Sequence, residues 1–159
     1  HRIDVESANE MHEAMMAESP DADVVIMSAA VADFRPAAVA DQKIKKADGV
    51  PSVELEPTVD ILAALGEQKP LAQVLVGFAA ETNDLEANAT DKLKRKGADL
   101  LVANDVSAPG VGFAHDTNAV TIFGSDGSAQ VVPLSTKDAI ARAVLAAVID
   151  RLPSESQNP

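Results

Sequence analysis

The chain has 159 residues, of which 25 are acidic and 13 are basic, so its formal net charge is −12. Hydrophobic residues make up 47% of the chain, aromatic residues only 3%, and there is no cysteine. This composition predicts one folded domain over 1–152 with a sizeable core. It excludes disulfides, thiolate nucleophiles and cysteine metal sites, and it argues against a nucleic-acid partner, which needs a broad basic face.

Hydropathy and the two ends of the chain indicate its cellular location and its boundaries. No apolar run approaches the roughly 20 residues that a membrane span requires, so we expect a cytoplasmic protein without a membrane partner. The first residues, 1–5, are typical of the end of a strand, which suggests a fragment of a longer chain. The polar segment 153–159 contains two prolines and predicts a disordered tail.

Helix and strand signals alternate along the chain. Ser7 and Glu10 form a capping box, and Gly97 follows a basic last helical turn. Several apolar runs are continuous, which is typical of parallel strands buried on both faces. The elements expected in chain order are a helix to about Ala17, a strand over 24–30, a loop over 38–50, a short strand over 53–55, a helix from a Thr58 cap to about Gln68, a strand over 74–78, a helix over 84–96, a strand over 98–104, a hairpin around 124–127 and a last helix from 135 to about 152.

This alternation predicts a three-layer, Rossmann-like α/β domain. Its sheet should be mostly parallel, with an antiparallel hairpin at one edge. Ligands of such sheets bind beyond the carboxyl ends of the strands. Three segments follow predicted strands, namely 29–34 (AAVADF), 77–82 (GFAAET) and 103–107 (ANDVS). We therefore expect these segments to meet at one rim of the sheet.

Basic residues are concentrated in two clusters, Lys43/Lys45/Lys46 and Lys92/Lys94/Arg95/Lys96. In an acidic chain this pattern indicates a local anion site, and a small phosphorylated ligand suits it best. The first cluster is either a lid over phosphates or a solvated surface run. Lys92 and Lys96 share a helix face. Compensation of the helix dipole is the alternative there, and it explains Lys96 better than Lys92.

The predicted rim carries further candidate residues, each with a structural alternative. The small residues before Asp33 would let a ligand approach the backbone, and the Asp33 carboxylate could accept from a ribose hydroxyl or an amine, or simply belong to a turn. Phe78 could stack on a base or pack in the core. Asn104 could bind substrate or form an Asx turn. The chain contains no Walker A sequence, no complete glycine-rich dinucleotide fingerprint and no nucleophile elbow.

Taken in order, the segments AAVADF, KIKK, VDIL, GFAAET, DKLKRKG and ADLLVANDVS closely resemble the phosphopantothenate–cysteine ligase (phosphopantothenoylcysteine synthetase) domain of coenzyme A biosynthesis, over about 2–152. Each motif alone is weak, but their order and spacing are specific. In bacteria this domain is commonly the C-terminal half of a bifunctional protein whose other half is an FMN-dependent decarboxylase. The resemblance implies that CTP, with Mg²⁺, activates 4′-phosphopantothenate as an acyl-cytidylate, and that cysteine then displaces CMP.

The resemblance also implies roles for individual residues. Lys43 would contact phosphate and help to stabilise the activated intermediate, which makes it the candidate catalytic residue. The metal ligands stay unknown, and the domain is expected to be a homodimer, within a larger oligomer in the parent protein. The residues implied to bind CTP are Met27, Ser28, Ala29, Asp33, Lys43, Val59, Asp60, Ile61, Leu62, Phe78, Lys92 and Lys96, and those implied near the acyl substrate are Ala29, Ala30 and Asn104.

Two departures from the family pattern qualify this expectation. The segment 58–61 reads Thr-Val-Asp-Ile where the family often has Asn-Pro-Asp-Ile. The family's Gly-rich opening and its Asn/Ser-rich segment do not occur in this sequence, so we expect CTP binding without full ligase activity. The residues alone do not select CTP over ATP. They also leave open another nucleotidyltransferase, or a non-catalytic nucleotide-binding or dimerisation module.

Overall fold

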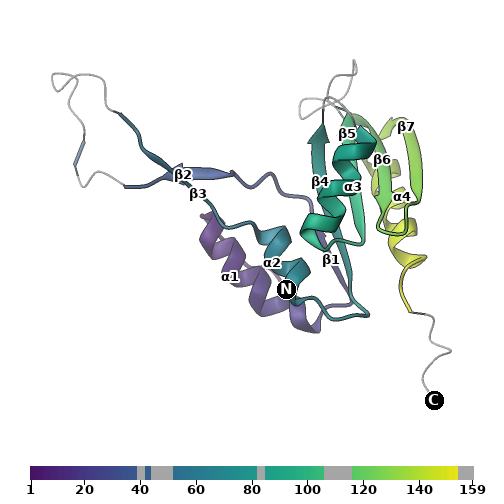
Figure 1. Ribbon diagram of the computed structural model, residues 1–159, viewed down its shortest axis with the longest axis horizontal. Helices are drawn as coiled ribbons and strands as arrows, with labels where there is room; N and C mark the ends of the chain where they lie inside the picture. The colour runs from purple at the N-terminus through teal and green to yellow at the C-terminus, as the bar shows by residue number, and fades with distance from the viewer. Residues whose placement is uncertain (39–41, 44–51, 82–84, 106–115, 154–159) are drawn as a thin grey trace.

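A five-stranded sheet lies at the centre of the computed structural model, which describes residues 1–38, 42–43, 52–81, 85–105 and 116–153 (Figure 1). Its elements are α1 (Ala8–Glu18), the 3₁₀ turn η1 (Ser19–Asp21), β1 (Val24–Met27), β2 (Phe34–Pro36), β3 (Leu55–Pro57), α2 (Ile61–Gln68), β4 (Val74–Glu81), α3 (Leu85–Lys96), β5 (Leu100–Asp105), β6 (Thr117–Gly124), β7 (Ala129–Thr136) and α4 (Lys137–Ile149).

The strand order β1-β4-β5-β6-β7 confirms the predicted arrangement of the sheet. β1, β4 and β5 pair in parallel, and β6 pairs antiparallel with both β5 and β7. The β6–β7 hairpin therefore forms the antiparallel edge that the turn signal at 124–127 predicted. No described helix is long and apolar enough to cross a membrane. Residues 154–159 of the predicted tail lie outside the described residues.

Helices cover both faces of the sheet, which makes the domain three-layered as predicted. Leu75 and Leu101 are fully buried toward α1, α2 and α3, whereas Val76 and Val102 are fully buried toward α4. Because successive side chains of a strand point to opposite faces, a strand covered on both faces needs apolar residues at every position. This requirement explains the continuous apolar runs of the sequence.

The segment before α2 is attached to the segment after β1. Thr58, predicted as the helix cap, instead donates its hydroxyl to the Ala32 carbonyl, and its backbone N–H donates to the Asp33 carbonyl at 2.9 Å. The cap is instead Asp60, whose Oδ1 accepts from the Ala63 N–H at 3.1 Å, and α2 begins at Ile61. The prediction of the Thr58 cap was wrong: tertiary contacts to 32–33 hold Thr58 outside the helix, and Asp60 provides the accepting oxygen of the cap.

A two-stranded ribbon formed by β2 and β3 extends away from the sheet (Figure 1). Arg35 and Glu56 face each other across it and form a 2.7 Å ion pair. A short strand was predicted near 53–55, close to the observed β3. Its partner β2 was not predicted, because three residues that include a proline carry no alternating pattern. Residues 1–5, predicted as a strand end, are not in a strand, because no described strand pairs with them.

The helices α2 and α3 approach each other backbone to backbone. A Cβ atom on Gly66 would overlap the Lys96 carbonyl oxygen and would lie 3.1 Å from the Cα atom of Gly97. Gly97 ends α3 with a φ of 62°, in the left-handed region that favours glycine. The two glycines therefore set the distance between two helices that, as described below, line one cavity.

Candidate functional site

A cavity of about 270 Å³ opens where β1 ends, on the face of the sheet that α2 and α3 cover. We call it the rim cavity. It is lined by Met27, Ala29, Val31, Ala32, Asp33, Thr58, Val59, Asp60, Ile61, Leu62, Phe78, Lys92 and Lys96.

Four segments that are distant in the chain build this cavity, and β4, which contributes Phe78, is one of them. The segment 27–33 follows β1, and the Thr58 hydrogen bonds hold it beside the start of α2. α3 contributes Lys92 and Lys96 from one face, as their spacing predicted. The contact between Gly66 and the end of α3 holds these lysines beside α2.

Lys96 forms an ion pair with Asp60 across the cavity. Asp60 Oδ2 accepts from Lys96 Nζ, while Asp60 Oδ1 caps α2. The Lys96 side chain is 15% exposed and that of Asp60 is 49% exposed, so the lysine is held in a largely buried position. One carboxylate thus both starts α2 and orients a cation that projects from α3.

The charges that line the cavity are balanced. Asp33 and Asp60 face Lys92 and Lys96, whereas the sequence had indicated a site dominated by cations. Asp33 is exposed, and its carboxylate makes no hydrogen bond or ion pair with the residues that the structure describes. Such a lining suits a ligand that carries hydroxyl or metal groups as well as negative charge.

The structure gathers the predicted CTP-binding residues in this cavity, with two exceptions. Ser28 lies on the other face of the sheet, and Lys43, in the connection between β2 and β3, is exposed and does not line the cavity. Of the predicted acyl-site residues, Ala29 lines the cavity, Ala30 does not, and Asn104 faces the opposite side of the sheet. The rest of the first lysine cluster, Lys45 and Lys46, lies outside the described residues.

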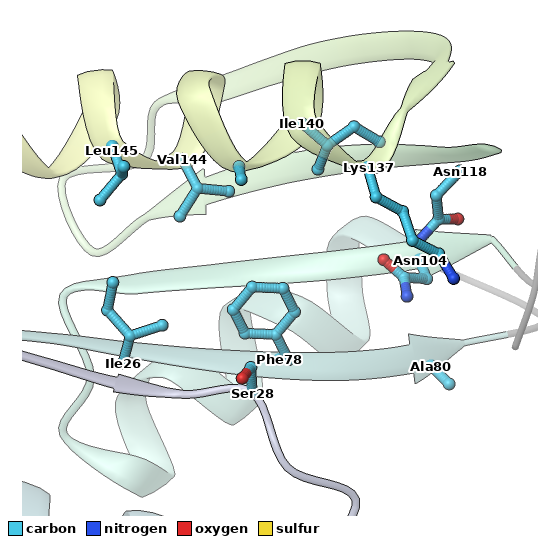
Figure 2. Close-up of a pocket in the computed structure, with 11 residues that line it drawn as sticks. Ile26, Ser28, Phe78, Ala80, Asn104, Asn118, Lys137, Ile140, Val144 and Leu145 are labelled. Carbon is cyan, nitrogen blue, oxygen red and sulfur yellow. The ribbon is translucent and has the colours of Figure 1, made fainter. Parts of the chain in front are cut away.

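A second cavity, of about 500 Å³, lies between the sheet and α4 (Figure 2). We call it the α4 groove. Polar side chains gather at one end of it and apolar side chains at the other, and the Phe78 ring points into it. Its lining consists of Ile26, Ser28, Phe78, Ala80, Asn104, Asn118, Lys137, Ile140, Ala141, Val144 and Leu145.

The sequence reasoning did not select Lys137 or Asn118, although one signal was present for Lys137. This lysine is the first residue of α4, where the helix dipole disfavours a positive charge. A cation in an electrostatically unfavourable position is a reason to look for a functional role. Asn118 lies within a strand and carries no comparable signal.

Comparisons with known proteins indicate the family of the chain. A family model described as the DNA/pantothenate metabolism flavoprotein C-terminal domain matches residues 1–152. The coenzyme A biosynthesis bifunctional protein CoaBC of Bacillus subtilis is 53% identical over 135 residues, which are 85% of this chain and 33% of that protein. A cysteine/cysteine sulfinic acid decarboxylase from an unknown prokaryotic organism is 44% identical over 147 residues, covering 92% of this chain and 41% of its own length.

A solved structure is also similar. The crystal structure of the C-terminal domain of coenzyme A biosynthesis bifunctional protein CoaBC superposes with a TM-score of 0.73 at 42% identity, covering 92% of this chain and 63% of that chain. The chain thus spans well under half the length of these two curated relatives. On the extent of the family match and these identities, the chain belongs to the family of the DNA/pantothenate metabolism flavoprotein C-terminal domain.

Proposed function

We propose that this chain is the CTP-binding part of a phosphopantothenate–cysteine ligase in coenzyme A biosynthesis. The observation that carries the proposal is the lining of the rim cavity, which contains every residue assigned to CTP by the resemblance except Ser28 and Lys43. Those residues come from four distant segments, so their convergence is a property of the fold. The relatives named for coenzyme A biosynthesis support the same pathway.

The proposed reaction has two steps. The carboxylate of 4′-phosphopantothenate attacks the α-phosphorus of CTP, and pyrophosphate leaves. The amine of cysteine then attacks the activated acyl carbon, and CMP leaves as the amide bond forms. In this scheme the backbone of 27–29 binds the base, Asp33 accepts from the ribose, and Lys92 and Lys96 hold phosphate oxygens. Lys43 stabilises the activated intermediate.

The balanced lining favours a magnesium complex of the nucleotide over the free triphosphate. Mg²⁺ prefers oxygen ligands and is usually held by one or two carboxylates together with substrate phosphates. In the magnesium complex Asp33 would hold the ion in place of the ribose hydroxyl, since Asp60 is engaged by Lys96 and by the α2 cap. When bound, Mg²⁺ offsets charge on the triphosphate.

We expect this chain to bind CTP at least ten-fold more tightly than ATP. A site whose backbone groups fit one base leaves them unpaired against another, and each buried unpaired group costs about 1–3 kcal/mol. Calorimetric titration of the chain with each nucleotide, in the presence of Mg²⁺, measures the difference. Equal affinities for CTP and ATP would contradict the assignment to cytidine and favour another nucleotidyltransferase.

Ligation by the 159-residue chain should be nearly absent, although CTP still binds. The family's Gly-rich and Asn/Ser-rich segments help to hold the acyl substrate, and aligned reactants account for several kcal/mol of rate enhancement. Pyrophosphate release with CTP, phosphopantothenate, Mg²⁺ and cysteine should be compared between this chain and the full-length protein. Equal rates would show that the acyl site is complete here, and no release from either would favour a non-catalytic binding module.

The remaining features of the parent protein follow from the same resemblance. We propose that the ligase domain acts as a homodimer, and that an FMN-dependent decarboxylase domain accompanies it in a larger oligomer. Sedimentation of the full-length protein and its flavin absorbance test these two statements separately.

A further inference from the structure

Two hydrogen bonds from a single residue hold the backbone on both sides of Asp33. The Thr58 hydroxyl donates to the Ala32 carbonyl, and the Thr58 N–H donates to the Asp33 carbonyl at 2.9 Å. These carbonyls belong to the peptide groups before and after the Asp33 Cα atom, and each peptide group is planar. Because both planes are held, the direction in which the Asp33 side chain leaves the backbone is also fixed. We call this pair of hydrogen bonds the Thr58 tether.

The side chain of Asp33 has no second support. Its carboxylate lines the rim cavity, is exposed, and makes no hydrogen bond or ion pair with the residues that the structure describes. Asp60, the other carboxylate of the cavity, is by contrast held by the Ala63 N–H and by Lys96. The position of the Asp33 carboxylate therefore depends on its own backbone, and that backbone is held by Thr58.

The Thr58 tether also lies at the root of the β2–β3 ribbon. Phe34 pairs with Pro57, so Asp33 and Thr58 are the next pair of residues toward the sheet. All three residues of β2 and two of the three residues of β3 are exposed, and the ribbon extends away from the sheet (Figure 1). A two-stranded ribbon has little stability of its own, so its direction depends on how its root is held. The connection between its two strands contains Lys43.

The Thr58 hydroxyl serves neither the helix nor a ligand as a donor. Helix α2 is capped by Asp60, so its first turn does not need Thr58. Thr58 lines the rim cavity, but a hydroxyl has only one proton to donate, and this proton goes to the Ala32 carbonyl. An effect of this hydroxyl on nucleotide binding would therefore act through the residues that the tether holds.

We propose that Thr58 is a positioning residue, which fixes Asp33 for the nucleotide and sets the direction of the ribbon that leads to Lys43. This inference rests on the proposed function. A group that is already oriented before binding loses less conformational freedom when the ligand arrives, so the tether raises CTP affinity through Asp33. It raises the rate of acyl activation through Lys43, because catalysis depends on the alignment of the reacting groups.

The first test is calorimetric titration of Thr58→Val with CTP and Mg²⁺. Valine keeps the shape of threonine without the hydroxyl, and we expect CTP binding to weaken about three-fold to ten-fold, the range that one hydrogen bond covers. Thr58→Ser keeps the hydroxyl and should bind CTP as wild type does. Thr90→Val is the matched control, because the Thr90 hydroxyl donates to the Glu86 carbonyl at 2.9 Å within α3 and does not line the rim cavity. It should leave CTP affinity unchanged.

A double-mutant cycle with Asp33→Ala tests whether Thr58 acts through Asp33. When the carboxylate is already absent, adding Thr58→Val should change CTP affinity by less than about two-fold, because nothing remains for the tether to position. A general loss of structure would instead weaken CTP binding equally in the presence and absence of Asp33. Additive effects of the two substitutions would therefore contradict the positioning role.

The direction of the ribbon can be measured without any nucleotide. The chain contains no cysteine, so spin labels attached to Ser52→Cys and Ser125→Cys report a single distance, from the far end of the ribbon to the β6–β7 turn. We expect this distance to be more broadly distributed in Thr58→Val than in wild type or Thr58→Ser. In the full-length protein, the kcat for pyrophosphate release should also fall in Thr58→Val and recover in Thr58→Ser.

The outcomes separate this inference from the proposed function. If wild type does not bind CTP, the proposed function itself is wrong. If wild type binds CTP and Thr58→Val binds it equally well, the proposed function stands and the role of Thr58 toward Asp33 is wrong. Identical distance distributions in wild type and Thr58→Val would show that the tether does not direct the ribbon.

Discussion

Replacing Gly66 by alanine is expected to lower the free energy of unfolding by about 3 kcal/mol and to weaken CTP binding about ten-fold. The added Cβ would overlap the Lys96 carbonyl oxygen and would lie 2.9 Å from the Lys96 carbonyl carbon. These are backbone atoms, which cannot rotate away as a side chain can. The two helices must separate, and Lys96 then moves away from Asp60 and from the rim cavity.

The measurements are urea unfolding and calorimetric titration with CTP. Alanine has the higher helix propensity by about 1 kcal/mol, so a loss of stability can only come from the contact between the helices. Gly127→Ala is the matched control, because a Cβ there meets no atom within 4 Å and the positive φ of 84° makes only the local backbone unfavourable. It should cost about 1 kcal/mol and leave CTP affinity unchanged. Wild-type stability in Gly66→Ala would refute the argument.

Replacing Lys96 by methionine is expected to weaken CTP binding roughly ten-fold to a hundred-fold while weakening CMP binding much less. In the proposed function Lys96 contacts an outer phosphate, which CMP does not have. Methionine keeps most of the length and the apolar stem of the side chain, so the change removes mainly the charge. Calorimetric titrations with the two nucleotides give the ratio of CTP affinity to CMP affinity. We expect Lys92→Met to change this ratio in the same direction.

Two controls separate the phosphate contact from the ion pair between Lys96 and Asp60. Lys94→Met removes a cation from an exposed position of α3 that does not line the rim cavity. Its effect on CTP affinity therefore measures only the long-range electrostatic contribution of one positive charge. Asp60→Asn breaks the ion pair but keeps a residue that caps helices well. It should lower stability by about as much as Lys96→Met, on the order of 1 kcal/mol. Because Lys96 keeps its charge, the ratio of CTP affinity to CMP affinity should fall less than in Lys96→Met. Equal ratios in Lys96→Met and Lys94→Met would contradict the proposed contact.

Much of the fold was predictable because its signals are local. The capping box of Ser7 and Glu10, the C-terminal glycine of α3 and the glycines of the β6–β7 turn each act within a few residues of themselves. The continuous apolar runs predicted parallel strands because burial on both faces leaves no polar position. The common face of Lys92 and Lys96 followed from helical periodicity alone.

The candidate site was only partly predictable, because several of its contacts join residues far apart in the chain. That Thr58 bonds to Ala32 and Asp33 rather than capping α2, and that Asp60 pairs with Lys96, depends on distances that no local pattern encodes. The glycine contact between α2 and α3 is equally invisible in the sequence, since Gly66 alone looks like a weak helix residue.

Periodicity and the ends of strands predicted the α/β class, the parallel strands buried on both faces, and the placement of Asp33, Phe78, Lys92 and Lys96 near one rim, whereas Met27 and 59–62 were expected there only from the family resemblance. Only the tertiary structure decided that two carboxylates balance the two lysines, and that Ser28, Asn104 and Lys137 share a second cavity on the other face. Charge balance and cavity shape depend on the tertiary structure because they arise from packing between elements. Periodicity tells which face of its own element a residue lies on, whereas packing decides what that face meets.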